Sequence, residues 1–243
     1  MFADGDDLAT AQRRKIDAIL DLASVGPGCE MLEIGTGWGE LAIRAAQRGA
    51  HVTTVTLSTE QRDLALRRVA AAGVSGRVRI LVADYREVAG QYDAIVSVEM
   101  VEAVGRRFWR DYFSTLDRLL RPGGRIGLQS ITVSHDRLLA TQHSYTWIHK
   151  YIFPGGIVPS IEAIDTTLQT HTSLAIAERR DFGPDYATTL KCWRDTFLAN
   201  WPTIESDRFD GVFKRMWEFY LAYCEAGFRV SYLGVSQFAL VRS

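Results

Sequence analysis

The sequence has 243 residues, 47% of them hydrophobic and 23% charged, which fits a soluble domain with a sizeable core. Its formal net charge of -1 argues against nucleic acid as a partner, since phosphate backbones are bound through an excess of basic residues. Three widely spaced cysteines indicate neither a disulfide framework nor a metal site, and we recognise no signal peptide or apolar span, so we expect a cytoplasmic protein.

The first half of the chain predicts helices and strands in alternation. A helix over residues 12–23 has apolar residues spaced for one buried face, and Gly26, Pro27 and Gly28 end it. Strands are predicted at 30–34, 50–57, 77–84, 92–100 and 125–133, and helices at 41–48, 60–73 and 108–120, the last stopped by the Pro-Gly-Gly at 122–124. This alternation is typical of a doubly wound parallel sheet in an α/β fold, which binds ligands at the carboxyl ends of its strands.

After Val133 the alternation stops. Residues 174–182 and 232–242 predict a sixth and a seventh strand, and two helical stretches at 185–199 and 207–226 lie between them. These stretches are rich in large apolar residues, namely Leu190, Trp193, Phe197, Trp201, Phe213, Met216, Trp217, Phe219, Tyr220 and Tyr223. We interpret them as a helical cap over the carboxyl edge of the sheet, with ordinary core packing as the alternative for any single aromatic residue.

The stretch "LEIGTGWGELAIRAA" joins an apolar strand to a helix through three glycines, a turn that commonly binds a nucleotide. A phosphate-binding loop is excluded, because Gly37 is followed by Trp38, Gly39 and Glu40 rather than by Gly-Lys-Ser/Thr. A dinucleotide site is also disfavoured, because the third glycine comes one place early and Glu40 would repel a pyrophosphate at the helix N-terminus.

S-adenosylmethionine fits this turn better, because it carries a sulfonium, an amine and one carboxylate but no phosphate. Glycines allow the backbone to approach such a ligand closely, and Glu33 is placed to face its cationic end. The predicted cofactor-binding residues of the turn are Glu33, Gly35, Thr36, Gly37 and Gly39.

Polar residues after the next two strands extend this prediction. Many methyltransferases bind the ribose with an acidic residue after the second strand, but here "VTLSTEQ" presents Thr56, Leu57, Ser58 and Gln61, whose polar members can hydrogen-bond instead. After the third strand, Asp84 is placed to accept from the adenine amino group, with Tyr85 and Arg86 beside the ring. A helix N-cap is the other role open to Asp84.

Five segments, "VTLSTEQ", "DYRE", "SVEMVEAVG", "LLRPGG" and "WIHKYIFPGG", carry a resemblance to a known family. With them, nearly the whole sequence resembles the cyclopropane-fatty-acyl-phospholipid synthase and mycolic acid cyclopropane synthase family. The resemblance implies methyl transfer from S-adenosylmethionine to the double bond of an unsaturated acyl chain of a phospholipid, giving a cyclopropane or a methylene- or methyl-branched chain. It also implies a bicarbonate ion at the reacting carbon.

The chemistry of this reaction gives the cap a use beyond packing. An alkene that attacks a sulfonium methyl becomes a carbocation, so the site must be apolar, stabilise positive charge and provide a base. Aromatic faces suit a cation. The resemblance thus implies one methyltransferase domain over 1–243, with a seven-stranded, mostly parallel sheet. Its parts would be a cofactor-binding core at about 24–133, a lipid-binding cap with the sixth strand at about 134–230, and the last strand at about 231–243.

Four residues are carried over from the family as catalytic. Glu102 matches its active-site glutamate and Tyr186 its active-site tyrosine, while a charge at a helix start is the alternative role of Glu102. Gln129 stands where the family usually has histidine, and Ile131 matches the residue whose backbone helps to hold the anion. The resemblance implies a proton relay around bicarbonate as the base. Because glutamine cannot titrate, we expect Gln129 to favour a branched product.

The sequence departs from the family pattern in further ways. A "YSC"-like segment with a cysteine usually precedes the first helix, and we expect neither it nor the extra amino-terminal domain of the enlarged bacterial forms here. Ala103 stands where a histidine usually follows the glutamate.

Two other functions stay open, a methyltransferase acting on a small hydrophobic molecule and a non-catalytic protein that binds the cofactor or a lipid. For the lipid enzyme we expect peripheral contact with the inner face of the membrane. Arg106, Arg107 and Arg110 then meet lipid headgroups or form a solvated helix start. A methyl-branched product would need a reductase partner. The sequence leaves the oligomeric state open.

Overall fold

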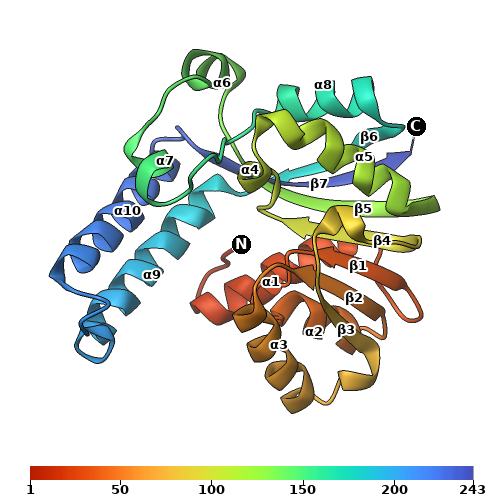
Figure 1. The fold of residues 1–243 in the computed structure, drawn as a ribbon, viewed down its shortest axis with the longest axis horizontal. Helices are drawn as coiled ribbons and strands as arrows, with labels where there is room; N and C mark the ends of the chain where they lie inside the picture. The colour runs from red at the N-terminus through yellow and green to blue at the C-terminus, as the bar shows by residue number, and fades with distance from the viewer. Residues whose placement is uncertain (243) are drawn as a thin grey trace.

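The computed structural model describes residues 1–242 and is built on one seven-stranded sheet (Figure 1). The strand order is β3-β2-β1-β4-β5-β7-β6, and every neighbouring pair is parallel except those made by β7. The strands are β1 (Glu30–Ile34), β2 (His51–Thr56), β3 (Val78–Val82), β4 (Tyr92–Val98), β5 (Leu120–Thr132), β6 (Leu174–Asp181) and β7 (Gly234–Arg242). The predicted mostly parallel, seven-stranded sheet is confirmed.

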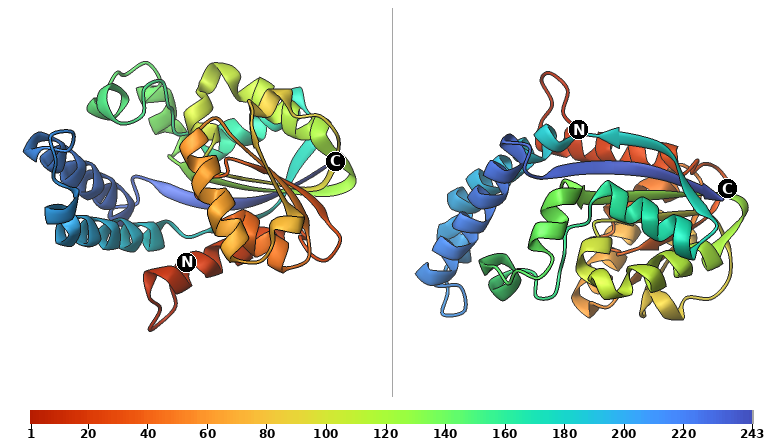
Figure 2. Two further views of the ribbon diagram at one scale, coloured as in Figure 1. Left: turned by 60° about the horizontal axis from the view of Figure 1, so that its bottom comes forward. Right: turned by 90° about the horizontal axis from the view of Figure 1, so that it is seen from above.

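Helices cover both faces of the sheet (Figure 2). One face carries α1 (Leu8–Leu22), α2 (Glu40–Gln47) and α3 (Thr59–Ala71), and the other carries α5 (Trp109–Leu119) and α8 (Ile161–His171). The central strands are apolar on both sides, as a doubly covered sheet requires. Two separate hydrophobic cores result, one under α1 and α2 and one under α5 and α8.

Short elements follow the carboxyl ends of the strands and shape the loops there. They are α4 (Val101–Val104), α6 (His135–Thr141) and α7 (Trp147–Tyr151), with the 3-10 turns η1 (Ser75–Arg77), η2 (Tyr85–Glu87) and η3 (Arg106–Phe108). The sequence had not predicted α4, α6, α7 or α8. Each of α4, α6 and α7 is too short for helical periodicity to stand out.

The predicted cap is a hairpin of two helices, α9 (Gly183–Ile204) and α10 (Gly211–Arg229), inserted between β6 and β7. It projects beyond the carboxyl edge of the sheet and is anchored by a third core that includes Leu190, Leu221 and Phe228 (Figures 1 and 2). Its outer aromatic residues are exposed, with 41% of Trp193 and 53% of Phe219 in contact with solvent. Ordinary core packing therefore does not account for these side chains.

Two sequence predictions about boundaries are wrong. The sequence predicts a cap that begins at about residue 134, but Ile164 and Leu168 of α8 pack in the core under α5, so this helix covers the sheet. The Pro-Gly-Gly segment at 122–124 does not end α5, because Leu120 is already extended and begins β5. Among the described helices, none has both the length and the apolar composition needed to cross a membrane.

Candidate active site

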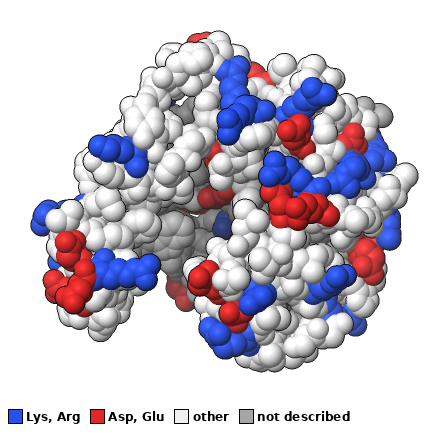
Figure 3. Space-filling model, in the orientation of Figure 1, with Lys and Arg blue, Asp and Glu red and all other residues white. Residues whose placement is uncertain are grey.

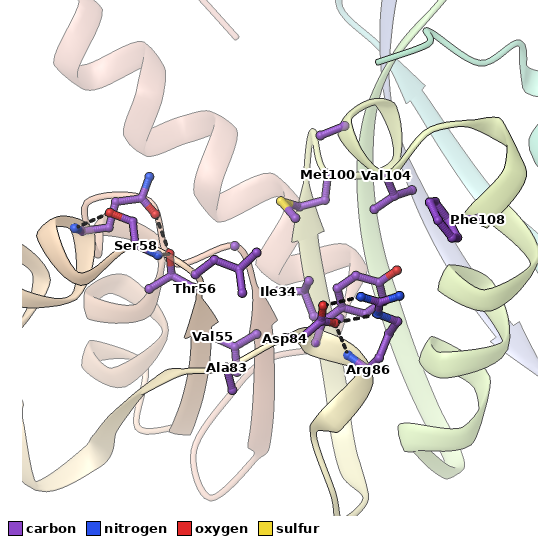
Figure 4. Close-up of a pocket in the computed structure, with 15 residues that line it drawn as sticks. Ile34, Val55, Thr56, Ser58, Ala83, Asp84, Arg86, Met100, Val104 and Phe108 are labelled. Atoms are coloured by element: carbon purple, nitrogen blue, oxygen red, sulfur yellow. Dashed lines mark hydrogen bonds and ion pairs between the residues drawn. The ribbon is translucent and has the colours of Figure 1, made fainter. Parts of the chain in front are cut away.

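A cavity of about 470 Å³ opens at the carboxyl ends of β1 to β4 (Figure 4). The strand order reverses between β1 and β4, and such a switch point is where open α/β sheets bind their ligands. Thr56 and Ser58 lie at one end of the cavity, and Val104 and Phe108 lie at the other. The predicted cofactor residues that line it are Gly35, Thr56, Leu57, Ser58, Gln61, Asp84, Tyr85 and Arg86.

The glycines of the turn after β1 have different roles. At Gly35, with φ +96°, a Cβ atom would lie 3.0 Å from the sulfur of Met100, which also lines the cavity. At Gly39 a Cβ would lie 3.0 Å from that of Ala65 on α3, so this glycine permits close packing of helices. A Cβ at Gly37 would meet no protein atom within 4 Å, so only a bound ligand could crowd this position.

Glu33 and Thr36 are buried and do not line the cavity. Glu33 is 3% exposed and one of its carboxyl oxygens has no hydrogen-bond partner among the described residues. Burial raises the pKa of Glu33 to about 8. The hydroxyls of Thr36 and Thr54 are 2.7 Å apart and tie the turn to β2. Together with Gly37 and Gly39, these two residues are not among those that line the cavity.

The segment after β2 is organised by hydrogen bonds between its own residues. The Thr56 hydroxyl donates to the side-chain oxygen of Gln61 at 2.7 Å, and the Ser58 hydroxyl caps α3 by accepting from the Gln61 amide. Within residues 1–242 the side-chain nitrogen of Gln61 has no protein partner, so it can donate to a ligand. Leu57 is 75% exposed at the rim of the cavity.

Asp84 follows β3 and performs the capping role that the sequence had left open. Its carboxylate accepts from the backbone of Arg86 at 2.9 Å and pairs with the guanidinium at 2.6 Å (Figure 4). The Arg86 hydrogen bond lowers the pKa of Asp84, so this acceptor stays ionised. Tyr85 packs edge-to-face on Tyr112 with ring centres 5.6 Å apart. The cavity thus has polar groups at separate strand ends and apolar walls between them.

A second group of polar residues surrounds Glu99, which directly follows β4. The side-chain amide of Gln129 donates to one Glu99 oxygen at 2.8 Å, and the Tyr186 hydroxyl donates to the other at 2.7 Å. Glu99 has φ +55°, a conformation that side-chain-bearing residues rarely adopt. Sequence reasoning missed this residue, although it lies three positions before Glu102 at the carboxyl end of a predicted strand.

Glu102 lies on α4 and has its own partners. One of its oxygens accepts from the Ile131 amide at 2.6 Å and from the Ser130 hydroxyl at 3.1 Å. The other oxygen is buried without a partner among the described residues. Burial, followed by the nearby charge of Glu99, raises the pKa of Glu102 to about 8.

The predicted relay around bicarbonate differs from this arrangement. Tyr186 donates to Glu99 and not to an anion beside Glu102, and the Ile131 amide binds Glu102 itself. Gln129 is fully buried, and its oxygen accepts from Gln237 at 3.0 Å. Every donor that the resemblance assigns to bicarbonate is therefore engaged by a side-chain carboxylate, and a bicarbonate ion does not fit among them.

A small cavity of about 130 Å³ lies on the other side of Glu99. Tyr186 and Trp193 from α9 line it together with Lys15 from α1. Burial lowers the pKa of Lys15, and the charge of Glu99 opposes that shift, which places the two side chains close enough to interact. Residues 99 and 100 thus line different cavities, because Met100 contributes to the larger one.

The strand order, the antiparallel β7 and the cavity at the switch point define the class as the methyltransferase fold. The family described as mycolic acid cyclopropane synthetase matches residues 1–238. The chain is 57% identical to the tuberculostearic acid methyltransferase UfaA1 of Mycobacterium tuberculosis over 236 residues, which are 97% of this chain and 55% of that protein. It is 38% identical to the cyclopropane-fatty-acyl-phospholipid synthase of Escherichia coli, over 94% of this chain and 57% of that protein.

The chain therefore belongs to the mycolic acid cyclopropane synthetase family, as its sequence resemblance had implied. It spans about half the length of these two relatives. Two solved structures, cyclopropane synthase MmaA2 from Mycobacterium tuberculosis and mycolic acid cyclopropane synthase CmaA1 complexed with SAH and CTAB, share its fold. Each has a TM-score of 0.86 and 29% identity, over 98% of this chain and 86% of the other.

Proposed function

We propose that this chain transfers a methyl group from S-adenosylmethionine to the double bond of an unsaturated fatty acyl chain of a phospholipid. The observation that carries this proposal is the placement of Glu99 and Met100. These consecutive residues separate a cofactor-sized cavity from a group of acid-base side chains beneath an aromatic hairpin. Methyl donor and carbon acceptor would meet at this boundary.

The larger cavity suits S-adenosylmethionine by the chemistry of its lining. Gln61 and Thr56 are placed for the ribose hydroxyls, Asp84 for the adenine amino group, and Gly35 for close passage of the methionine part. A relative of this family, CmaA1, was solved with SAH, the demethylated form of this cofactor. When bound, the cofactor supplies an electrophilic methyl group, and the residues around it fix the direction in which that methyl points.

The hairpin suits an acyl chain and the positive charge that develops on it. Figure 3 shows a hollow between the α9–α10 hairpin and the sheet, with mostly uncharged walls on this face. Trp193 lies beside Tyr186 with ring centres 6.2 Å apart, so two aromatic faces are close to Glu99. Aromatic faces attract cations without reacting with them, and apolar walls exclude water that would capture a carbocation.

An aromatic rim offers a route to lipid in a bilayer. We define this rim as Tyr145, Tyr151, Phe153, Phe219 and Tyr223, which are between 50% and 75% exposed. It joins α7 to α10, since Trp147 contacts Phe219 with ring centres 5.0 Å apart. Exposed aromatic residues favour the interface between water and lipid. We therefore propose peripheral contact with the inner face of the cytoplasmic membrane, made through this rim.

A branched product is favoured over a cyclopropane. One relative is named a tuberculostearic acid methyltransferase, and this chain has Gln129 where the family usually has histidine. Gln129 acts through Glu99, to which it donates. The product of the chain alone is then a methylene-branched lipid, and a saturated methyl branch requires a separate reductase.

The test uses the purified chain, isotopically labelled S-adenosylmethionine and vesicles of a monounsaturated phospholipid. Mass spectrometry should find label in the acyl chains, whereas vesicles of the matching saturated phospholipid should remain unlabelled. Binding of the cofactor without labelled lipid would contradict the proposal and favour a binding protein. Label in an added small hydrophobic amine or phenol alone would favour the other enzyme.

A further inference from the structure

Glu99 occupies a backbone position that normally favours glycine. Its φ is +55°, and within residues 1–242 only three residues other than glycine have a positive φ. The other two, at Ser24 and Ser231, belong to turns at the ends of α1 and α10. A residue held in a costly conformation at a strand end beside a cavity points to a role for its side chain.

The side chain of Glu99 is oriented from three directions. Gln129 on β5 and Tyr186 on α9 each bind one carboxylate oxygen, at 2.8 and 2.7 Å. Gln129 is itself held by Gln237 on β7, so its donor cannot turn away. Lys15 lines the small cavity together with Glu99, and the charge of Glu99 favours the protonated form of Lys15. Each oxygen of an ionised carboxylate accepts more than one hydrogen bond, so both retain the capacity to accept a proton.

Glu102 is the other carboxyl group of this site, and its surroundings suit a different state. It is buried with one unpartnered oxygen, and burial together with the charge of Glu99 raises its pKa to about 8. A carboxyl group in such surroundings favours its protonated form at neutral pH. Glu102 then keeps its proton, and Glu99, which accepts hydrogen bonds from Gln129 and Tyr186, is left as the acceptor of the pair.

We propose that the Glu99 carboxylate is the base that removes a proton from the transferred methyl group, in the position that the family resemblance gives to bicarbonate. This inference rests on the proposed methyl transfer to an alkene. The donors expected to hold an external anion, Tyr186 and Gln129, are already bound to this carboxylate. The chain therefore carries its own base.

The π electron pair of the alkene forms a bond to the methyl carbon while the carbon–sulfur bond breaks, and its electron pair stays on sulfur. The other alkene carbon becomes a cation. A hydride then shifts to it from the methylated carbon, and the positive charge moves to the methylated carbon. Glu99 then takes one proton from the new methyl group, and the carbon–hydrogen electron pair forms the double bond of the methylene branch. Direct loss of that proton before the hydride shift would close a cyclopropane instead.

The experiment compares the parent chain with Glu99→Gln and Glu99→Gly in buffer purged of carbon dioxide and bicarbonate. Glutamine keeps the shape without the charge, and glycine suits the backbone while opening space for a small anion. Glu178→Gln, on the exposed part of β6, is the matched control. Calorimetric titration with the demethylated cofactor checks that each variant folds and binds.

We expect the parent chain and Glu178→Gln to be active without bicarbonate. Glu99→Gln should form methylene or cyclopropane lipid at least about 100-fold more slowly, as for loss of a general base. Added formate or bicarbonate should restore Glu99→Gly severalfold and leave the parent unchanged, which a purely structural role would not produce. Parent activity that requires bicarbonate, or a Glu99→Gln variant as active as the parent, overturns this inference alone. A parent chain that labels no unsaturated lipid overturns the proposed function and this inference with it.

Discussion

The hydroxyl of Tyr186 donates a 2.7 Å hydrogen bond to Glu99, a residue 87 positions earlier in the chain. This contact joins the hairpin to the carboxyl end of β4 and so connects the lipid-facing part of the site with the sheet. Burial and the negative charge of Glu99 raise the pKa of Tyr186 well above its usual value. Tyr186 therefore remains a neutral donor at physiological pH.

Tyr186→Phe should slow turnover at least about tenfold, because it removes one of the two hydrogen bonds that orient Glu99. The ring would still stack on Phe228 at 4.6 Å, so the hairpin should keep its position and cofactor binding should be unchanged. Tyr92→Phe, whose hydroxyl makes only a 3.3 Å contact to the Ala89 carbonyl, is the control. Full activity of Tyr186→Phe would show that this hydroxyl is dispensable.

Gly35→Ala should weaken binding of the cofactor at least about tenfold, a cost of about 1.4 kcal/mol. The added Cβ would meet the Met100 sulfur at 3.0 Å and push that side chain into the cavity. Gly90→Ala is a matched control, since Gly90 has the same φ of +96° and no atom within 4 Å of the added Cβ. Calorimetry of both variants separates backbone strain from crowding, and equal losses in the two would contradict the assignment.

Asp84→Asn should weaken cofactor binding about tenfold or more. The neutral amide oxygen of asparagine would form a weaker hydrogen bond with the adenine amino group than the charged carboxylate does. Asp93→Asn provides the comparison. Asp93 forms a 2.7 Å ion pair with Arg121 and does not line the cavity. That variant should lower the melting temperature without changing the affinity. The assignment of Asp84 to the adenine would fail if both variants bound the cofactor as tightly as the parent.

Glu33→Gln should stabilise the protein at alkaline pH and have little effect in acid. The folded-state pKa of Glu33 is raised to about 8, so the folded chain binds more protons than the unfolded chain between the ordinary pKa of about 4.5 and that value. The free energy of unfolding therefore falls as pH rises through this window, and glutamine removes the loss. Melting temperatures of parent and variant at about pH 5 and about pH 9 should diverge only at the higher pH.

Glu178→Gln is a suitable control for that comparison, because Glu178 is exposed and paired with Arg180. A Glu33→Gln variant that melts below the parent at both values would mean that the carboxyl contributes a hydrogen bond that the amide cannot replace.

The sequence predicted the sheet and several residues that line the larger cavity because these depend on local patterns. The apolar strand that ends at Ile34, the glycine turn that follows it and the polar residues after β2 are each short, continuous segments of the sequence. Leu57 and Asp84 were found in the same way.

The catalytic group could not be predicted to the same extent. In the sequence, Glu99 is only a polar residue at the end of a strand. Its role depends on contacts with β5, α9 and α1, which are distant from it in the sequence. The partners of Ile131 and Glu102 likewise follow from how β5 lies beside α4. Helix α8 was missed because its exposed face contains several threonines, which weaken the helical pattern, while only Ile164 and Leu168 are fully buried.

The most direct test of the whole account follows the hydrogen atoms of the transferred methyl group. The chain is incubated with S-adenosylmethionine carrying a trideuterated methyl group and with vesicles of a monounsaturated phospholipid, and the acyl chains are analysed by mass spectrometry. Transfer to the alkene followed by loss of a methyl proton predicts an acyl chain that retains two of the three deuterium atoms. A labelled product that retains all three, or label found only outside the lipid, would contradict the account.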